Sequence, residues 1–214
     1  KPATLTASRV LPYAHNDLFN IIADVPSYAT FLPYCQRSTV TKWSAADAHG
    51  KRWPSEATLV VGYVGVHEGF QSKVYCVAPG EGKGNTGVGI VEAVSGNGQT
   101  RLGPDLIAHH LQDAAPSEGS TQAEAAEGDS GLLTHLLTRW TLRPFMFKPP
   151  PGEGDAQPRP QDKADDEALS QTECSVSIEY AFANPIYGAM SAGAAPFVAE
   201  RMIQAFEERV KDVL

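Results

Sequence analysis

Residues 82–87, GKGNTG, have the G-x-G-x-x-G spacing of loops that hold the pyrophosphate of a dinucleotide. Such a loop binds phosphate only where a strand enters it and a helix leaves it, because the helix N-terminus supplies the amides and the dipole. The next residues, 88–94, are β-branched and closed by turn residues, which is typical of a short strand. We therefore predict that the motif connects two strands and binds no nucleotide.

Few side chains could perform acid–base chemistry in an apolar interior. Strand alternation places Glu68 on the same face as Phe70, and Tyr63 and Tyr180 are the other polar candidates. Glu68 could hydrogen-bond the headgroup of a ligand, but we favour a structural role at the start of its strand, with the carboxylate reaching a partner or solvent. The sequence contains no Ser-His-Asp order and no H-E-x-x-H motif. We predict no catalytic residue and no enzyme.

The three cysteines, Cys35, Cys76 and Cys174, are far apart and form no C-x-x-C pair. Neither a disulfide framework nor a zinc site follows from this spacing, and we predict no metal. We interpret the cysteines as reduced thiols that are buried as small apolar residues in an intracellular compartment. No apolar run reaches the length of a transmembrane helix.

The net charge of -8 is concentrated in two polar segments. Residues 114–131 contain four acidic residues and no basic one, whereas residues 151–171 contain six acidic and two basic residues. The rest of the chain is therefore neutral. A neutral remainder without a clustered basic face argues against nucleic acid as a partner.

The chain is predicted to form a single domain over residues 1–214, with flexible acidic insertions at about 98–131 and 149–171. Both insertions are rich in small and polar residues that cannot bury enough apolar surface to become ordered. His109 and His110 lie in the first insertion, and we expect both to be exposed to solvent.

The apolar pattern predicts an α+β fold. Its period is helical over residues 16–25 and 27–31 and becomes two from residue 57 onwards. Strands are predicted at 4–11, 36–44, 57–63, 68–76, 88–95, 132–142 and 173–183. A long helix is predicted from Pro185 to Leu214, with a stripe formed by Met190, Ala194, Phe197, Val198, Met202, Phe206, Val210 and Val213. This order predicts a helix-grip arrangement, in which a curved antiparallel sheet of about six to seven strands wraps around the C-terminal helix and leaves a cavity.

Residues 18–35, LFNIIADVPSYATFLPYC, resemble the coenzyme Q-binding (Coq10) family of the START-like, polyketide-cyclase-related superfamily. The residues of the family motif fall at Asp24, Val25, Tyr28, Phe31, Pro33 and Cys35. Further matches occur at residues 59–63, 68–74, Trp140 with Pro144, and 202–207. The resemblance covers residues 4–97, 132–147 and 172–214, so the acidic insertions depart from the family pattern.

The resemblance implies a lipid chaperone or carrier that binds ubiquinone in a hydrophobic cavity. It also implies a peripheral location on the matrix side of the mitochondrial inner membrane and support of respiratory electron transport and coenzyme Q biosynthesis. Coenzyme Q biosynthetic or respiratory complexes are the implied protein partners, and ubiquinone is the implied bound ligand. The ligand-binding candidates, each of which could equally be a core residue, are Phe31, Pro33, Leu59, Val61, Tyr63, Glu68, Phe70, Trp140, Phe182, Phe197, Met202 and Phe206.

A membrane contact is predicted at Phe145, Met146 and Phe147, three apolar residues between Arg143 and Lys148. Apolar residues flanked by basic ones are typical of a loop that dips into a membrane interface. The alternative interpretation is that the two phenylalanines close one end of the core.

Two other functions are compatible with a START-like fold. A cyclase-like enzyme acting on a small aromatic or polyketide substrate would need a paired acid and base in the cavity. A ribosome-associating protein would need a basic exposed face. The sequence favours neither over a carrier, although kinship of fold alone cannot separate the three.

Overall fold

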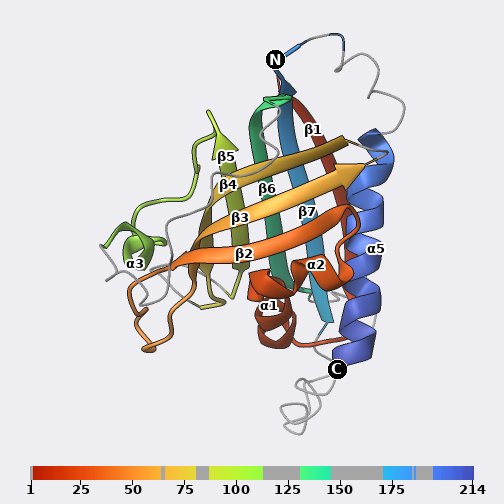
Figure 1. The fold of residues 1–214 in the computed structure, drawn as a ribbon. Coiled ribbons are helices and arrows are strands. Elements are labelled where there is room, and N and C mark those ends of the chain that lie inside the picture. Colours follow the sequence, from red (N-terminus) through yellow and green to blue (C-terminus); the bar gives the residue numbers. More distant parts are fainter. Residues whose placement is uncertain are drawn as a thin grey trace, which may run out of the picture.

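One antiparallel sheet of seven strands forms the centre of the described part of the molecule in this computed structural model (Figure 1). The structure describes residues 2–63, 66–80, 87–112, 131–145, 171–184, 186 and 195–214. The strands are β1 (Ala3–Leu11), β2 (Cys35–Trp43), β3 (Pro54–Tyr63), β4 (Val66–Val77), β5 (Gly89–Gly96), β6 (Leu133–Phe145) and β7 (Gln171–Phe182). Their order in the sheet is β1-β7-β6-β5-β4-β3-β2, which confirms the predicted antiparallel architecture.

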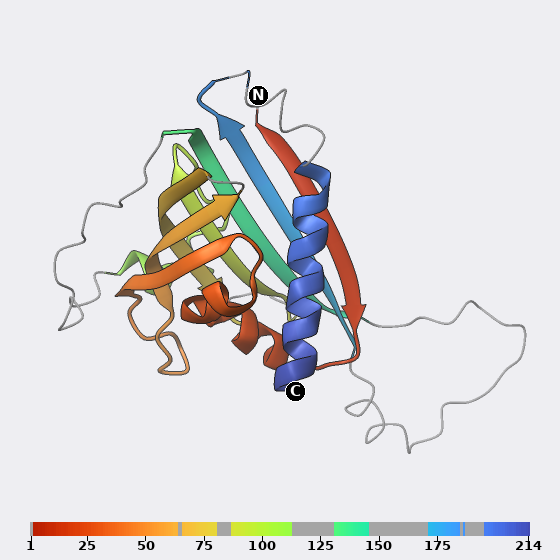
Figure 2. The same ribbon diagram turned by 45° about the vertical axis from the view of Figure 1, so that its right-hand side comes forward.

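The long C-terminal helix α5 (Ala195–Val213) lies on the inner face of the sheet, where it contacts β1 and β7 (Figure 2). The helix α1 (His15–Ala23), the 3₁₀ turn η1 (Val25–Ser27) and the short helix α2 (Tyr28–Phe31) follow β1 along the chain. Both α1 and α2 contact α5. The sheet, α2 and α5 therefore enclose the interior from different sides.

The buried face of α5 differs from the predicted stripe. Ala199, Ile203, Phe206 and Val210 are fully buried, at the helical spacing i, i+4, i+7 and i+11. The prediction was wrong for Phe197, whose side chain is 64% exposed, because it lies two residues before Ala199 and thus roughly 200° around the helix. The prediction was also wrong for Val213, at the C-terminal end of the helix, which is 48% exposed. The predicted start of the helix, at residues 185 and 187–194, falls outside the described residues.

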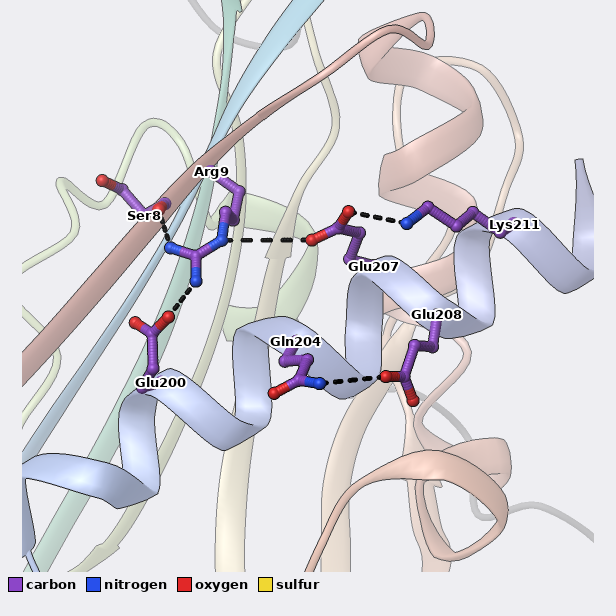
Figure 3. A network of polar contacts seen from close by, with 7 residues as sticks. All are labelled: Ser8, Arg9, Glu200, Gln204, Glu207, Glu208 and Lys211. Carbon is purple, nitrogen blue, oxygen red and sulfur yellow. Dashed lines mark hydrogen bonds and ion pairs between the residues drawn. The ribbon is translucent and has the colours of Figure 1, made fainter.

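Polar contacts on the outer surface of α5 attach the helix to β1 (Figure 3). The Arg9 guanidinium forms an ion pair with Glu200, and its Nε lies 3.9 Å from Oε2 of Glu207, two turns further along the helix. Glu207 also accepts a hydrogen bond from Nζ of Lys211 at 2.8 Å. One side chain of β1 therefore contacts α5 at two points.

Residues 98–112 are packed against the sheet, so the predicted flexible insertion at 98–131 begins too early. This segment ends in the short helix α3 (Ala108–Leu111), and both Ile107 and His109 are buried. His110 is half-buried, so the predicted exposure of the two histidines is wrong. Ile107 and the half-buried Leu102 and Leu106 supply apolar surface to this packing. The largely polar composition of the segment did not indicate it. Residues 113–130 of this insertion, and residues 149–170 of the second, lie outside the described residues.

The chain segments around the glycine motif and the cysteines agree with the predictions where the structure describes them. The element that follows the motif is strand β5, and Gly87 has a positive φ of 84°. Residues 82–86 lie outside the described part. Cys76 and Cys174 are fully buried and Cys35 is half-buried, and all three are free thiols.

Candidate functional site: an apolar cavity beneath the C-terminal helix

A cavity of about 180 Å³ lies between the sheet, the turn that follows α2, and α5. It is lined by Val25, Tyr28, Leu32, Pro33, Tyr34, Cys35, Leu59, Val61, Phe70, Val74, Val91, Ala93, Leu136, Thr138, Trp140, Ile178, Val198 and Met202. Alternate residues of β3 to β7 supply the floor, because side chains at i and i+2 share one face of a strand. Most of the lining is aliphatic or aromatic, so the cavity suits an apolar ligand.

Half of the predicted ligand-binding residues line this cavity. They are Pro33, Leu59, Val61, Phe70, Trp140 and Met202. All six were selected by strand or helix face together with the sequence motif, and the closure of the sheet around α5 brings them together.

The other predicted aromatic residues lie elsewhere in the molecule. Phe206 is fully buried behind the lining, with its ring centroid 5.3 Å from that of Trp140. Phe31 packs edge-on against Tyr28, and Phe182 packs edge-on against Tyr180, without lining the cavity. These contacts give Phe206 and Phe31 a packing role beside the cavity.

Two further predicted ligand-binding residues are Phe197 and Tyr63. Phe197 points to solvent from the outer side of α5, as described above. The backbone of Tyr63 ends β3, but its side chain lies outside the described residues.

Glu68 is buried, with only 5% of its surface exposed, and its carboxylate does not line the cavity. Its Oε1 accepts a hydrogen bond from the backbone N–H of Leu133 at 3.1 Å. This bond joins the start of β4 to the start of β6 beyond the last residue of β5. The contact matches the structural interpretation that the sequence favoured.

Several lining residues were not predicted, and Tyr28, Tyr34, Cys35 and Thr138 are the polar ones among them. Tyr28 and Cys35 belong to the sequence motif, and Thr138 shares a strand face with Trp140. Their positions could have been inferred from these two signals. Val198 belongs to the apolar stripe predicted for the C-terminal helix, although it was not among the predicted ligand-binding residues.

The polar groups of the lining are mostly engaged by the protein itself. The Tyr28 hydroxyl donates to the carbonyl oxygen of Ile22 at 2.5 Å, and burial raises the pKa of this phenol well above its usual value. The Tyr34 hydroxyl accepts a hydrogen bond from Arg201 at 3.2 Å. Burial raises the pKa of the Cys35 thiol to about 11, so this thiol is protonated at neutral pH. These groups can anchor or orient a ligand more readily than they can exchange protons with it.

The described residues near the predicted membrane contact are exposed. Phe145 ends β6 and is 39% exposed, and Arg143 and Pro144 beside it are also exposed. Phe145 is therefore no core residue. Met146 and Phe147 lie outside the described residues. No helix in the described ranges is long and apolar enough to cross a bilayer.

The sheet, the C-terminal helix in its grip and the cavity between them define a START-like fold. A START superfamily protein from Mycobacterium smegmatis shares this fold with a TM-score of 0.56 and 15% identity, over 99% of each chain. A protein from Thermus thermophilus shares it with a TM-score of 0.50 and 13% identity, over 98% of each chain.

The family model described as polyketide cyclase / dehydrase and lipid transport matches residues 11–207, and the chain belongs to that family. A curated relative is the mitochondrial coenzyme Q-binding protein coq10 of Schizosaccharomyces pombe, which is 41% identical over 70 residues. This alignment spans 33% of the chain and 40% of that relative's length. Family membership and the apolar cavity together support a role in binding a lipid or similar ligand.

Proposed function

We propose that the protein binds ubiquinone in the cavity beneath α5 and acts as a lipid chaperone or carrier, without catalysing a reaction. The observation that carries this proposal is the lining of the cavity, which is mainly aliphatic and aromatic and contains no acid–base pair among the described residues. The similarity to a coenzyme Q-binding protein supports ubiquinone as the ligand. The carrier would support respiratory electron transport and coenzyme Q biosynthesis, with complexes of those processes as partners.

A carrier of this kind is physically reasonable. Each methylene removed from water contributes about 0.8 kcal/mol, so a free polyprenyl tail does not dissolve appreciably in an aqueous compartment. Transfer from bilayer to protein is close to neutral, because both environments are apolar. The cavity of about 180 Å³ is small beside typical ligand pockets, so it would hold the headgroup end while a long tail extends past Pro33 and Met202.

The decisive experiment is organic extraction of the protein purified from a ubiquinone-producing host, followed by mass spectrometry. We expect ubiquinone in the wild-type extract and its loss from Ala93→Leu, because Ala93 lines the cavity and a larger side chain would fill it. Ala29→Leu, which adds the same volume to an exposed position of α2, should retain the lipid. A folded wild-type protein that yields only bulk phospholipid, or nothing, would refute the proposal.

The proposed location is the matrix side of the mitochondrial inner membrane, where Phe145, Met146 and Phe147 would form the peripheral contact. Phe145→Asp should reduce flotation with liposomes of phosphatidylcholine and cardiolipin, because a charge is costly in the apolar part of the interface. Leu111→Asp is the matched control, since Leu111 is 60% exposed on α3. Equal flotation of wild type and Phe145→Asp would remove this membrane contact.

A further inference from the structure

Thr138 occupies the middle of the cavity floor. The register of the sheet places it between Ala93 on β5 and Ile178 on β7, and Val74 on β4 lies beyond Ala93 in the same row. All four residues line the cavity. Thr138 thus places one hydroxyl in an otherwise aliphatic row.

The Thr138 hydroxyl makes no hydrogen bond with any described residue. The neighbouring row shows a different arrangement, because the hydroxyls of Ser72 and Ser95 lie 2.6 Å apart and bond to each other. Tyr28 and Tyr34 are likewise engaged, as described above. Thr138 is half-buried, so a ligand that fills the cavity would remove this hydroxyl from water, and a hydrogen-bond acceptor on the ligand would offset the cost.

A second donor lies beside Thr138. Trp140 is two residues further along β6, on the same face and roughly 7 Å away. It lines the cavity, and only 2% of its surface is exposed. Its indole N–H also makes no hydrogen bond within the described part of the chain, although a buried indole usually finds an acceptor.

We propose that Thr138, assisted by the Trp140 indole N–H, is the hydrogen-bonding site for an oxygen acceptor on the ligand. This inference rests on the proposed function and specifies how its ligand is recognised. The acceptor is a carbonyl or ether oxygen, because the indole N–H can only donate and the hydroxyl can donate as well. The ring of a quinone therefore enters first and lies on the β5–β7 floor, and its tail leaves past the half-buried residues Pro33 and Cys35.

The test compares Thr138→Val with Thr141→Val in binding a short-tailed ubiquinone, measured by quenching of tryptophan fluorescence. Both changes remove a hydroxyl from β6, but Thr141 lies on the opposite face of the strand. Thr138→Val should weaken binding about tenfold, because the ligand oxygen is left without its donor. Thr141→Val should bind as the wild type does.

A second ligand separates the hydrogen bond from the shape of the site. An alkylbenzene with the same tail but no ring oxygens, measured by displacement of the quinone, should bind equally to wild type and Thr138→Val. If both ligands lose the same affinity, or if neither does, the role of Thr138 is refuted while the proposed function stands. A folded wild type that binds no quinone would refute the proposed function and this inference together.

The orientation has an independent readout on the wild-type protein. A ubiquinone analogue with a photoreactive azide on the ring should label the β6 peptide that contains Thr138. Labelling of the peptide around Pro33 and Cys35 instead would place the ring at the opposite end of the cavity and overturn the proposal.

Discussion

Strands β5 and β6 carry a charged pair on their outer face and the Thr138 hydroxyl on their inner face, and these polar groups differ in their contacts. On the outer face, Glu92 is completely buried, and its Oε2 accepts a hydrogen bond from Nε of Arg139 on the neighbouring strand at 2.6 Å. On the inner face, one residue away, Thr138 has no partner among the described residues. The outer pair joins the two strands, although Oε1 of Glu92 has no hydrogen-bond partner among the described residues, whereas the inner hydroxyl faces the cavity and is available to a ligand. Comparison of the faces thus separates polar residues that hold the sheet together from those available to a ligand.

The largest expected effect comes from breaking the outer pair. Arg139→Met leaves the Glu92 carboxylate buried without its cation, and we expect a loss of about 3 kcal/mol in the free energy of unfolding. Urea denaturation measures this loss. Ligand affinity should change far less than stability, because neither residue lines the cavity.

The double variant Glu92→Leu/Arg139→Met is the control for that prediction. Oε1 of Glu92 has no hydrogen-bond partner in the described part of the chain, so the pair is incompletely satisfied even in the wild type. Replacement of both partners by apolar residues should therefore restore most of the lost stability. A double variant as unstable as Arg139→Met would show that the pair itself is not what matters.

An effect of similar size is expected from His110, whose ring accepts a backbone hydrogen bond from β4. The pairing of β4 with β3 extends to Lys73, and beyond it the Cys76 N–H donates to Nε2 of His110 at 2.9 Å. Burial, together with the charge of His109, lowers the pKa of His110 to about 4. The neutral ring is therefore the form that fits this site.

This pKa predicts a pH dependence of stability. Between about pH 6.5 and pH 4 the unfolded chain binds a proton at His110 while the folded protein does not, so stability is present above this window and falls as the pH falls through it. The total change is about 3 kcal/mol, and His110→Phe should remove it from the stability profile. His49→Phe, on an exposed loop, should leave the profile unchanged. Identical profiles for wild type and His110→Phe would contradict the prediction.

The smallest loss of stability is expected from the ion pair on the outer surface of α5. This variant tests whether the burial of an ion pair, rather than its presence, determines how much it contributes to the free energy of unfolding. The Arg9 side chain is 39% exposed and its partner Glu200 is 49% exposed, so solvent screens their attraction (Figure 3). Arg9→Met should lower stability by less than about 1 kcal/mol, and by still less at high salt. A loss of stability comparable to that of Arg139→Met would mean that this contact determines how α5 packs against the sheet.

Strand periodicity predicted the sheet and four of the proposed cavity residues, because alternation assigns Leu59, Val61, Phe70 and Trp140 to the inner face. It failed where position depends on a partner that is distant in the sequence. Phe197 was wrongly assigned to the apolar stripe because the spacing of apolar residues does not fix which side of α5 faces the sheet. His109 was predicted to be exposed because the surrounding segment is polar, but it is buried beside Cys76 of β4.

The sequence by itself determined the order of elements, the inner faces of the strands and the resemblance to a lipid-binding family, since these follow from local periodicity and short motifs. Tertiary structure alone decided which polar groups have partners. Glu92 and Arg139 meet because β5 and β6 pair in one register, and Thr138 has no partner among the described residues because its row is otherwise aliphatic. Hydrogen bonding between distant residues depends on register and packing, and those are fixed only when the sheet closes around α5.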